Sequence, residues 1–231
     1  MLSRLRRWLR PAATGDYVLL ASVGALCACL WLFLEIAEEV REGDLQPLEE
    51  RIMRSLRSPD DLHHLRGPAW LEVVARDLSA LGGTTVLTLV TAIALGYLLL
   101  LGRRRTALFL ALAIGGGTMV SSLLKVAIGR TRPDLLLHLM EATSPSFPSG
   151  HSMLSSVVYL TLGALLARLV SRRAQKSFCI LTALALSFLV GLSRVFLGVH
   201  YPSDVMAGWT AGIAWSLLCG IVASRGRGWA L

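Results

Sequence analysis

Long apolar stretches alternate with polar segments along the sequence. A helix that crosses a lipid bilayer needs about 20 consecutive, mostly apolar residues, and six stretches reach or approach that length. They lie at 17–36, 83–101, 106–128, 152–170, 178–192 and 204–223. The pattern therefore predicts six transmembrane helices, and we expect the fifth, which is short, to extend a few residues at either end.

The composition changes this picture little, because it also indicates a membrane protein. Of the 231 residues, 54% are hydrophobic and 16% are charged, whereas soluble domains average about 25% charged residues. The composition argues against a soluble globular enzyme, and it excludes a disordered chain, which would be poor in apolar residues. We therefore expect an all-α integral membrane protein in which six transmembrane helices form a bundle.

The first apolar stretch follows an arginine-rich N-terminus that is also typical of signal peptides. These arginines are Arg4, Arg6, Arg7 and Arg10. The apolar run after them is longer than the roughly 7–15 residues of a signal peptide's hydrophobic region, and no small-x-small cleavage site ends it. The first stretch is therefore interpreted as a retained transmembrane helix.

Lysine and arginine are distributed unequally between the two sets of alternate connections. One set comprises the N-terminal segment, the turns after the second and fourth helices, and the C-terminus. It holds 13 of the 23 lysines and arginines, with Asp16 as its single acidic residue. Cytoplasmic flanks of membrane helices are enriched in Lys and Arg, so we expect both termini in the cytoplasm and the longer connections in the periplasm of a bacterial cell. The net charge of +8 mainly reflects this orientation in the cytoplasmic (inner) membrane.

The same pattern divides the chain into five segments. They are a cytoplasmic N-terminal segment (1–16), the first transmembrane helix (17–37), a periplasmic connection (38–82), the helical core (83–223) and a cytoplasmic tail (224–231). Apolar residues in the connection recur at helical spacing, at Leu48, Ile52, Met53 and Leu56. Charged residues lie on the other side, at Glu49, Glu50, Arg51 and Arg54. The pattern predicts an amphipathic helix, which either lies at the membrane interface or packs as a cap over the bundle.

Charged residues near membrane helices are functional candidates, and the end of the third helix carries the first group. Small residues recur every four positions around Lys125, at Gly117, Ser121 and Gly129. Such a face permits close helix packing, so Lys125 is expected to point into the bundle, although a lone lysine there could also snorkel to the interface. Arg132 follows seven residues later on nearly the same side, and we expect Pro133 to end the helix. These two cations suit a phosphate, whereas Arg130 is expected to be a solvated loop arginine.

A Pro-Ser-Gly-His sequence at 148–151 precedes the fourth helix. Backbone N–H groups in a glycine-containing turn at a helix N-terminus can bind an anion. The turn supplies Ser149 and Gly150, and His151 starts the helix, where its imidazole can lie beside the bound anion. Alone, a Ser-Gly-His sequence is common and carries little information.

The start of the sixth helix supplies a histidine and an aspartate. Asp204 begins a stripe of small residues that continues at every fourth position, with Gly208, Gly212, Ser216 and Gly220. The stripe predicts that Asp204 faces protein rather than lipid, four residues after His200. An aspartate near a histidine can accept Nδ1–H, fix the tautomer and leave Nε2 free to attack, although such a pair can also be a structural contact that caps the helix. Arg194 adds a further donor for a phosphoryl oxygen.

Together the three segments resemble the signature of a known superfamily. Their patterns are Lys-x6-Arg-Pro, Pro-Ser-Gly-His and Ser-Arg-x5-His-x3-Asp, complete and in this order over residues 125–204. In these motifs the chain is similar to the type 2 phosphatidic acid phosphatase superfamily. That superfamily includes bacterial lipid phosphate phosphatases, undecaprenyl-diphosphate phosphatases and vanadate-dependent haloperoxidases. The six-helix layout extends the resemblance to most of the chain.

The resemblance implies a role for each motif residue. The phosphate-binding residues that it implies are Lys125, Arg132, Ser149, Gly150 and Arg194. His200 would be the nucleophile that forms a phosphohistidine, and Asp204 would orient and stabilise it. His151 would protonate the leaving oxygen and then activate the water that releases phosphate.

Neither a metal nor another cofactor is expected. Phosphoryl transfer depends largely on positioning and electrostatic stabilisation, which three cations and helix-end amides can provide. The sequence has no Asp-rich loop, and its histidines and cysteines lack metal-ligand spacing. The adjacent His63 and His64 are expected to be solvated, and His138 to have a core or interfacial role.

The motifs and the charge pattern predict an integral membrane phosphatase that hydrolyses a lipid-linked phosphate or diphosphate through a phosphohistidine. Its cations lie at the outer, periplasmic ends of the helices, where a phosphate arrives with its lipid tails still in the bilayer. The alternatives are a haloperoxidase-like enzyme that holds vanadate in the same pocket, and a lipid or anion transporter. A nucleic-acid partner is not expected, and the sequence selects neither the substrate lipid nor an oligomeric state.

Overall fold

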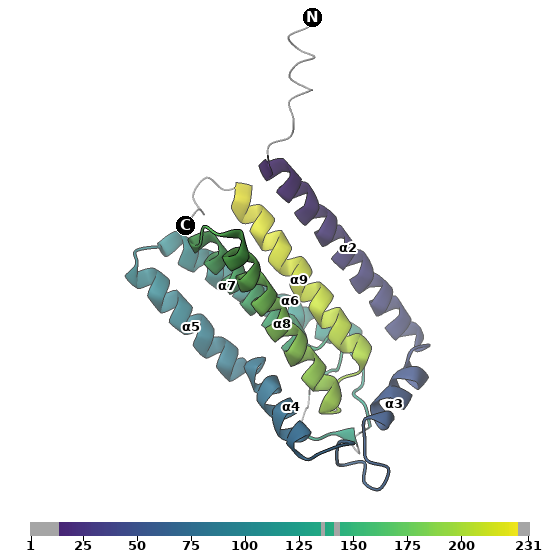
Figure 1. Ribbon diagram of the computed structural model, residues 1–231. Coiled ribbons are helices and arrows are strands. Elements are labelled where there is room, and N and C mark those ends of the chain that lie inside the picture. Colours follow the sequence, from purple (N-terminus) through teal and green to yellow (C-terminus); the bar gives the residue numbers. More distant parts are fainter. Residues whose placement is uncertain (1–13, 135–136, 141–143, 226–231) are drawn as a thin grey trace, which may run out of the picture.

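The computed structural model describes residues 14–134, 137–140 and 144–225. Within these ranges the regular elements are α-helices, apart from an isolated bridge between Arg57 and Leu65. Figure 1 shows the long helices packed side by side, with two shorter helices at one end of the bundle. The predicted all-α fold is confirmed. Arg4, Arg6, Arg7 and Arg10, which precede the first helix, lie outside the described residues. So do most of the two segments that are predicted to be cytoplasmic, 1–16 and 224–231.

Five helices in the described ranges are long and apolar enough to cross a bilayer. They are α2 (Thr14–Glu42), α6 (Arg104–Ile128), α7 (Gly150–Leu169), α8 (Arg173–Phe196) and α9 (Pro202–Arg225). The predicted second span corresponds to α5 (Thr84–Leu100), which has only 17 residues. Together with α4 (Trp70–Leu81), which meets it at a bend of 43°, it is long and apolar enough to count as a sixth span. The membrane bundle is therefore confirmed with five spans, or six when this bent pair is counted as one.

Helices α2 and α8 extend furthest beyond the apolar runs that predicted them. The sequence predicts that the first helix ends at 37, but α2 continues to Glu42. Val40 is buried in a cluster with Phe147 and Ala207, so packing against the bundle prolongs the helix past its apolar run. The fifth predicted helix extends at both ends as α8, in agreement with the expectation.

The connection 38–82 is largely helical and covers one end of the bundle. It contains α3 (Gln46–Ser55) and α4, which lie at the end where α2 finishes and α5 begins (Figure 1). On α3, Met53 is buried against Leu137 and Tyr201. This packing corresponds to the predicted cap over the bundle rather than to a helix that lies free at the interface.

The predicted assignment of faces on α3 holds for Met53, Arg51 and Arg54 but is wrong for Glu49 and Leu48. Glu49, which the pattern places on the polar side, is 4% exposed, whereas the apolar Leu48 is 56% exposed. The amphipathic pattern assumes that a charged residue faces water. Glu49 instead faces the protein, because a largely buried arginine described below pairs with it.

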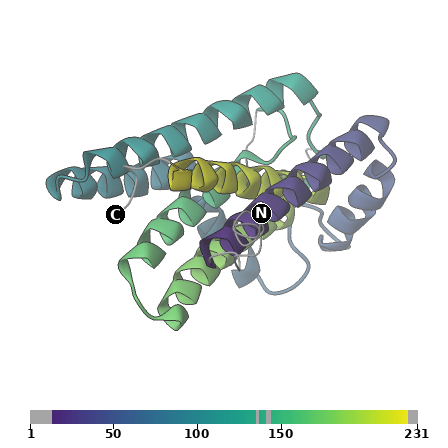
Figure 2. The same cartoon turned by 90° about the horizontal axis from the view of Figure 1, so that it is seen from above.

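Packing between α7 and α9 brings the motif around Ser149 close to the motif around Asp204. Helix α7 packs against α8 and α9, and α9 also packs along α2 (Figures 1 and 2). A Cβ atom on Gly208 would lie 2.7 Å from the Ser149 carbonyl oxygen, and one on Gly212 would lie 2.6 Å from that of Met153. The small-residue stripe thus permits α9 to approach α7 closely, and it brings the Asp204 carbonyl within 2.9 Å of the Ser149 backbone N–H.

Candidate active site

The three predicted segments meet at one end of the bundle around a cavity of about 660 Å³. The predicted site residues that line it are Lys125, Arg132, Gly150, His151, Arg194 and His200. Ser149 and Asp204 lie behind this lining, and both are fully buried. The structure thus brings all the predicted site residues together, while the roles assigned to them stay predictions.

The end of α6 differs from the prediction. Gly129 has a φ of +62°, a left-handed conformation that glycine adopts without strain, and its N–H donates to the Lys125 carbonyl at 3.0 Å. The helix therefore ends before Gly129 and not at Pro133. Arg132 reaches the cavity from the following loop, so its position does not follow from helical periodicity.

The start of α7 lies directly beside Lys125. Ser149 is the N-cap residue, and its Oγ accepts hydrogen bonds from the N–H of Ser152 at 3.4 Å and from the Ser152 hydroxyl at 2.9 Å. A Cβ atom on Gly150 would lie 3.4 Å from Lys125 Cε. Gly150 and His151 occupy the first helical turn, where an α-helix leaves N–H groups without intrahelical partners. The turn therefore combines free backbone donors with the lysine, as an anion site requires.

Three cations in the cavity have only uncharged partners. Lys125 Nζ donates to the Pro145 carbonyl (2.6 Å), Arg132 Nη1 to the Val199 carbonyl (2.5 Å) and Arg194 Nη1 to the Ser79 hydroxyl (2.6 Å). Arg194 is 3% exposed, and its Nε has no hydrogen-bond partner among the described residues. No carboxylate in the described part of the chain forms an ion pair with any of the three. Arg194 is buried, and Lys125 and Arg132 are partly buried. Because an unpaired charge that is shielded from water is costly, this arrangement suits a bound anion.

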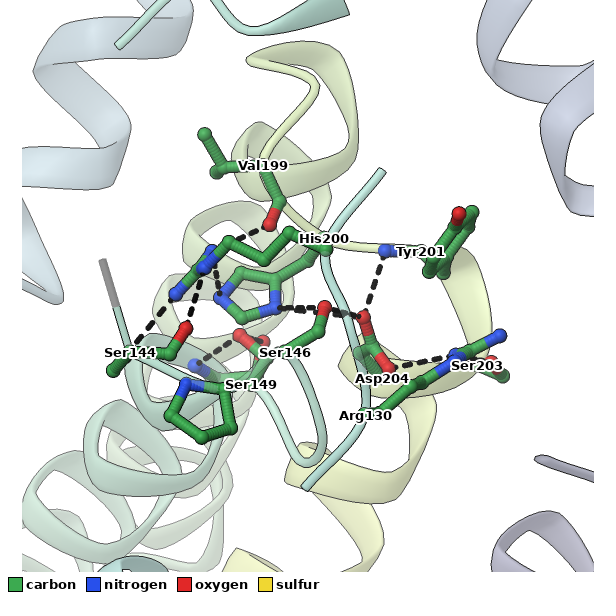
Figure 3. A network of polar contacts seen from close by, with 12 residues as sticks. Arg130, Ser144, Ser146, Ser149, Val199, His200, Tyr201, Ser203 and Asp204 are labelled. Carbon is green, nitrogen blue, oxygen red and sulfur yellow. Dashed lines mark hydrogen bonds and ion pairs between the residues drawn. The ribbon is translucent and has the colours of Figure 1, made fainter. Parts of the chain in front are cut away.

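His200 and Asp204 meet at the wall of the cavity, as the sequence predicts. His200 Nδ1 lies 3.5 Å from Asp204 Oδ2. The Ser146 hydroxyl donates a short hydrogen bond to the same carboxylate oxygen and lies 3.4 Å from Nδ1 (Figure 3). Asp204 Oδ2 also accepts the Tyr201 N–H at 2.9 Å. The Nδ1 side of the imidazole is thus occupied by acceptors, which leaves Nε2 on the side of Arg132, 3.4 Å from its Nη1.

The surroundings of His200 keep its imidazole neutral. The side chain is 1% exposed, and burial lowers the pKa of His200 to about 4, although Asp204 acts in the opposite direction. At neutral pH the ring is therefore uncharged, and Nε2 carries a lone pair when Nδ1 holds the proton. A neutral imidazole with a fixed tautomer is the form of histidine that can act as a nucleophile.

Arg130 is not the solvated loop arginine that the sequence suggests. Its side chain is 10% exposed, and its guanidinium bridges Glu49 Oε2 at 2.6 Å and Asp204 Oδ1 at 2.7 Å. It also lies over the Tyr201 ring, with its Cζ 4.3 Å from the ring centroid. Burial opposes its charge, but the two carboxylates outweigh burial and raise the pKa of Arg130. Glu49 lies 81 residues away in sequence, so local spacing cannot indicate this contact.

Two serines of the loop before α7 also belong to the site, and the sequence analysis missed both. Ser144 accepts from Arg132 twice, through its carbonyl from Nε at 2.7 Å and through its hydroxyl from Nη2 at 3.2 Å. Ser146, described above, links His200 and Asp204 (Figure 3). Serines are common in loops, and no spacing distinguishes these two from their neighbours.

The remaining histidines lie outside this arrangement. His63 and His64 are exposed, as expected, and His64 Nδ1 lies 3.2 Å from Glu72 Oε1. His138 is partly buried. In the described ranges no three or more His, Cys, Asp or Glu residues are grouped so that they could hold a metal; that no metal takes part stays a prediction.

The fold and the site together define a helical membrane protein with a cavity lined by three cations beside a histidine–aspartate pair. Comparison with known proteins gives the family. The family model of the PAP2 superfamily matches residues 106–226, a range that includes every predicted site residue. The chain belongs to this superfamily, as the resemblance of its three motifs implies.

The most similar proteins include named phosphatases. The chain is 31% identical to phosphatidylglycerophosphatase B of Bacillus subtilis (strain 168) over 188 residues, which are 78% of this chain and 86% of that protein. It is 38% identical over 129 residues to a lipid A 1-phosphatase of Rhizobium johnstonii, covering 51% of this chain and 47% of that protein. These matches confirm the predicted enzyme class, a phosphatase.

A solved structure shares the fold. The crystal structure of a transmembrane PAP2 type phosphatidylglycerolphosphate phosphatase from Bacillus subtilis superposes with a TM-score of 0.75 at 27% sequence identity. The match covers 87% of this chain and 98% of that chain. The similarity therefore extends beyond the matched family region, to the helices that precede it.

The unpaired cations predict that inorganic phosphate stabilises the protein. Phosphate should raise the melting temperature in detergent, because a ligand that binds only the folded state stabilises it. Arg194→Gln should abolish most of this shift, since it removes a buried donor. The measurement is thermal unfolding with and without phosphate at constant ionic strength, with Arg66→Gln, an exposed arginine, as control. An equal shift in Arg194→Gln and wild type would place the anion elsewhere.

Proposed function

We propose that this protein hydrolyses a lipid-linked phosphate or diphosphate, with His200 as its nucleophile, on the periplasmic side of the cytoplasmic membrane. One observation carries the proposal: Lys125, Arg132 and Arg194 surround one cavity without a carboxylate partner in the described ranges, and His200 lines the same cavity. Phosphoryl transfer places charge on three equatorial oxygens. Preorganised donors around that charge supply much of the catalysis.

The first step transfers the phosphoryl group to the histidine. His200 Nε2 attacks the terminal phosphorus and forms the N–P bond, while the P–O bond to the leaving group breaks. The leaving group is the lipid alcohol for a monophosphate and the lipid monophosphate for a diphosphate. His151, which lines the cavity, gives its proton to the leaving oxygen. Asp204 and Ser146, on the Nδ1 side, hold the Nδ1 proton and stabilise the positive charge that the ring acquires.

The second step releases phosphate. His151, now neutral, takes a proton from a water molecule whose oxygen attacks phosphorus. The N–P bond breaks, its electron pair returns to His200 Nε2, and inorganic phosphate leaves. Apart from the substrate and water, each step uses only groups of this chain, so the proposed mechanism requires no metal.

The shape of the cavity favours a lipid as the substrate. From the cations the cavity continues between the helices to apolar side chains of α5, α6 and α7. These are Leu87, Ala92, Leu95, Ile114, Leu154 and Val158. A phosphate held by the cations can therefore keep an attached hydrocarbon chain among apolar residues. Both named relatives, a phosphatidylglycerophosphatase and a lipid A phosphatase, act on lipid phosphates by name.

The charge distribution supports the proposed orientation. Arginines lie in or directly beside the turns between α5 and α6 and between α7 and α8, at the end of the bundle opposite α3 and α4 (Figure 1). They are Arg103, Arg104, Arg105, Arg168, Arg172 and Arg173. Cytoplasmic flanks are enriched in such residues, so the cavity is expected to open on the periplasmic side.

His200→Ala tests the proposed nucleophile. We expect purified wild-type protein to release phosphate from phosphatidate, phosphatidylglycerophosphate or undecaprenyl diphosphate in detergent micelles, with EDTA present. The variant should lose about 10³-fold or more of this activity, as the removal of a nucleophile does in other enzymes. His64→Ala, at an exposed histidine, should keep wild-type turnover.

The outcomes separate the alternatives. Full turnover by His200→Ala would refute the mechanism. Wild-type protein that is stabilised by phosphate but releases none from any of these lipids would instead support the transporter alternative. Loss of all activity in EDTA would indicate a metal.

A larger side chain at Ala92 tests whether the apolar part of the cavity holds the lipid chain. Ala92→Phe should raise KM for a long-chain lipid phosphate about tenfold, equivalent to about 1.4 kcal/mol of binding, and leave KM for para-nitrophenyl phosphate unchanged. Ile93→Phe is the matched control, because Ile93 is adjacent, is 63% exposed and does not line the cavity. Equal effects of Ala92→Phe on both substrates would contradict the proposed lipid site.

A further inference from the structure

We propose that Glu49 is a positioning residue of the active site, which acts on the nucleophile through Arg130 and Asp204. Glu49 belongs to α3, outside the region 106–226 that matches the superfamily. The inference rests on the proposed function, in which His200 attacks phosphorus and Asp204 supports it. Through Glu49, helix α3, which caps the bundle, would contribute to the chemistry of the site.

Both carboxylate oxygens of Glu49 are engaged in the protein interior. Oε2 lies 2.6 Å from Arg130 Nη2, and Oε1 accepts the backbone N–H of Ser203 at 2.7 Å. Ser203 lies in the first turn of α9, directly before Asp204. Glu49 therefore holds the arginine that contacts Asp204 and also the start of the helix that carries Asp204. A carboxylate is favoured there because it satisfies a free N–H at the positive end of the helix dipole.

Arg130 transmits this constraint to Asp204. Its Nη1 lies 2.7 Å from Asp204 Oδ1 and 2.8 Å from the Ser203 hydroxyl, while its Nη2 contacts Glu49. Since Oδ1 of Asp204 is held by Arg130, Oδ2 is the oxygen left to face His200 Nδ1 (Figure 3). The planar guanidinium fixes the two carboxylates relative to each other, as a lysine with a single nitrogen would not.

The charges give Glu49 an electrostatic role as well. Glu49, Arg130 and Asp204 together carry one net negative charge beside His200. During phosphoryl transfer the ring becomes positive, and that net charge stabilises it. Without the charge of Glu49, Arg130 would neutralise Asp204, and the group beside the histidine would have no net charge. Glu49 thus preserves the negative charge that Asp204 presents to His200.

Glu49→Gln removes this charge and keeps the shape of the side chain and the acceptor for Ser203. We expect kcat for phosphate release from a lipid phosphate to fall about 10- to 100-fold, similar to the loss when the hydrogen-bonding partner of a metal-ligating residue is mutated. KM should change less than about threefold, because Lys125, Arg132 and Arg194 are untouched. The matched control is Glu50→Gln, the same change at the next residue, whose carboxylate accepts from Gln46.

Two further variants distinguish positioning from a purely structural role. In an Arg130→Gln background, Glu49→Gln should cause little further loss of kcat, because residues that act through one contact are not additive. Glu49→Asp, which retains the charge, should recover part of the kcat lost in Glu49→Gln. Folded protein is quantified for each variant, so that kcat refers to folded enzyme. If Glu49→Gln does not fold, Arg130→Lys tests the contact between Glu49 and Asp204 instead. A lysine keeps the positive charge of Arg130, but its single nitrogen cannot bridge both carboxylates.

The proposal is overturned if Glu49→Gln, or Arg130→Lys in its place, keeps wild-type kcat per folded enzyme and only lowers the melting temperature. Additive losses in the double variant would overturn it as well. Failure of the proposed function would appear differently, as full activity in His200→Ala. An inactive His200→Ala together with a fully active Glu49→Gln would refute only the role of Glu49.

Discussion

Lys125, Arg132 and Arg194 form no ion pair with a carboxylate in the described part of the chain, and much of the site is arranged around their positive charge. Neutral groups hold each cation: the Pro145 carbonyl, the Val199 carbonyl and the Ser79 hydroxyl. These groups come from separate segments, so the cations also fix the loop before α7, the turn before α9 and the end of α4. In the proposed function, a phosphate supplies the missing negative charge. The anion affinity that we expect of the cavity thus follows from the absence of a carboxylate beside the cations as much as from the cations themselves.

A second set of charges lies behind the histidine and is kept apart from the first. Asp204 is engaged by Arg130, Ser146 and the Tyr201 N–H, so it supports His200 and does not neutralise the cations of the cavity. The cavity side is therefore positive, where we propose that the phosphoryl group binds. The opposite side is negative, where the imidazole becomes charged in the proposed mechanism. His200 lies between them, neutral at rest, because burial lowers its pKa to about 4.

Features encoded over short distances in the chain were predictable from the sequence. Apolar runs predicted the helices, and three local motifs predicted the residues that surround the cavity. Long-range contacts were not predictable: Arg130 and Glu49 pair across 81 residues, and periodicity alone places Glu49 in water. Helix α6 ends at a left-handed turn at Gly129. The sequence predicted that it ends at Pro133, because proline is the stronger helix-breaking residue. Ser144 and Ser146 have no distinguishing pattern, because their importance comes only from the side chains that surround them.

Direct detection of the covalent intermediate tests the central claim, that His200 accepts the phosphoryl group inside the ring of cations. Wild-type protein is mixed with a lipid phosphate labelled with ³²P, quenched in alkali, where phosphohistidine survives, and digested for peptide mapping. The account predicts label on the peptide that contains His200, and none in His200→Ala. Label on another residue, or turnover by wild type with no labelled protein at any quench time while His200→Ala remains active, would contradict it.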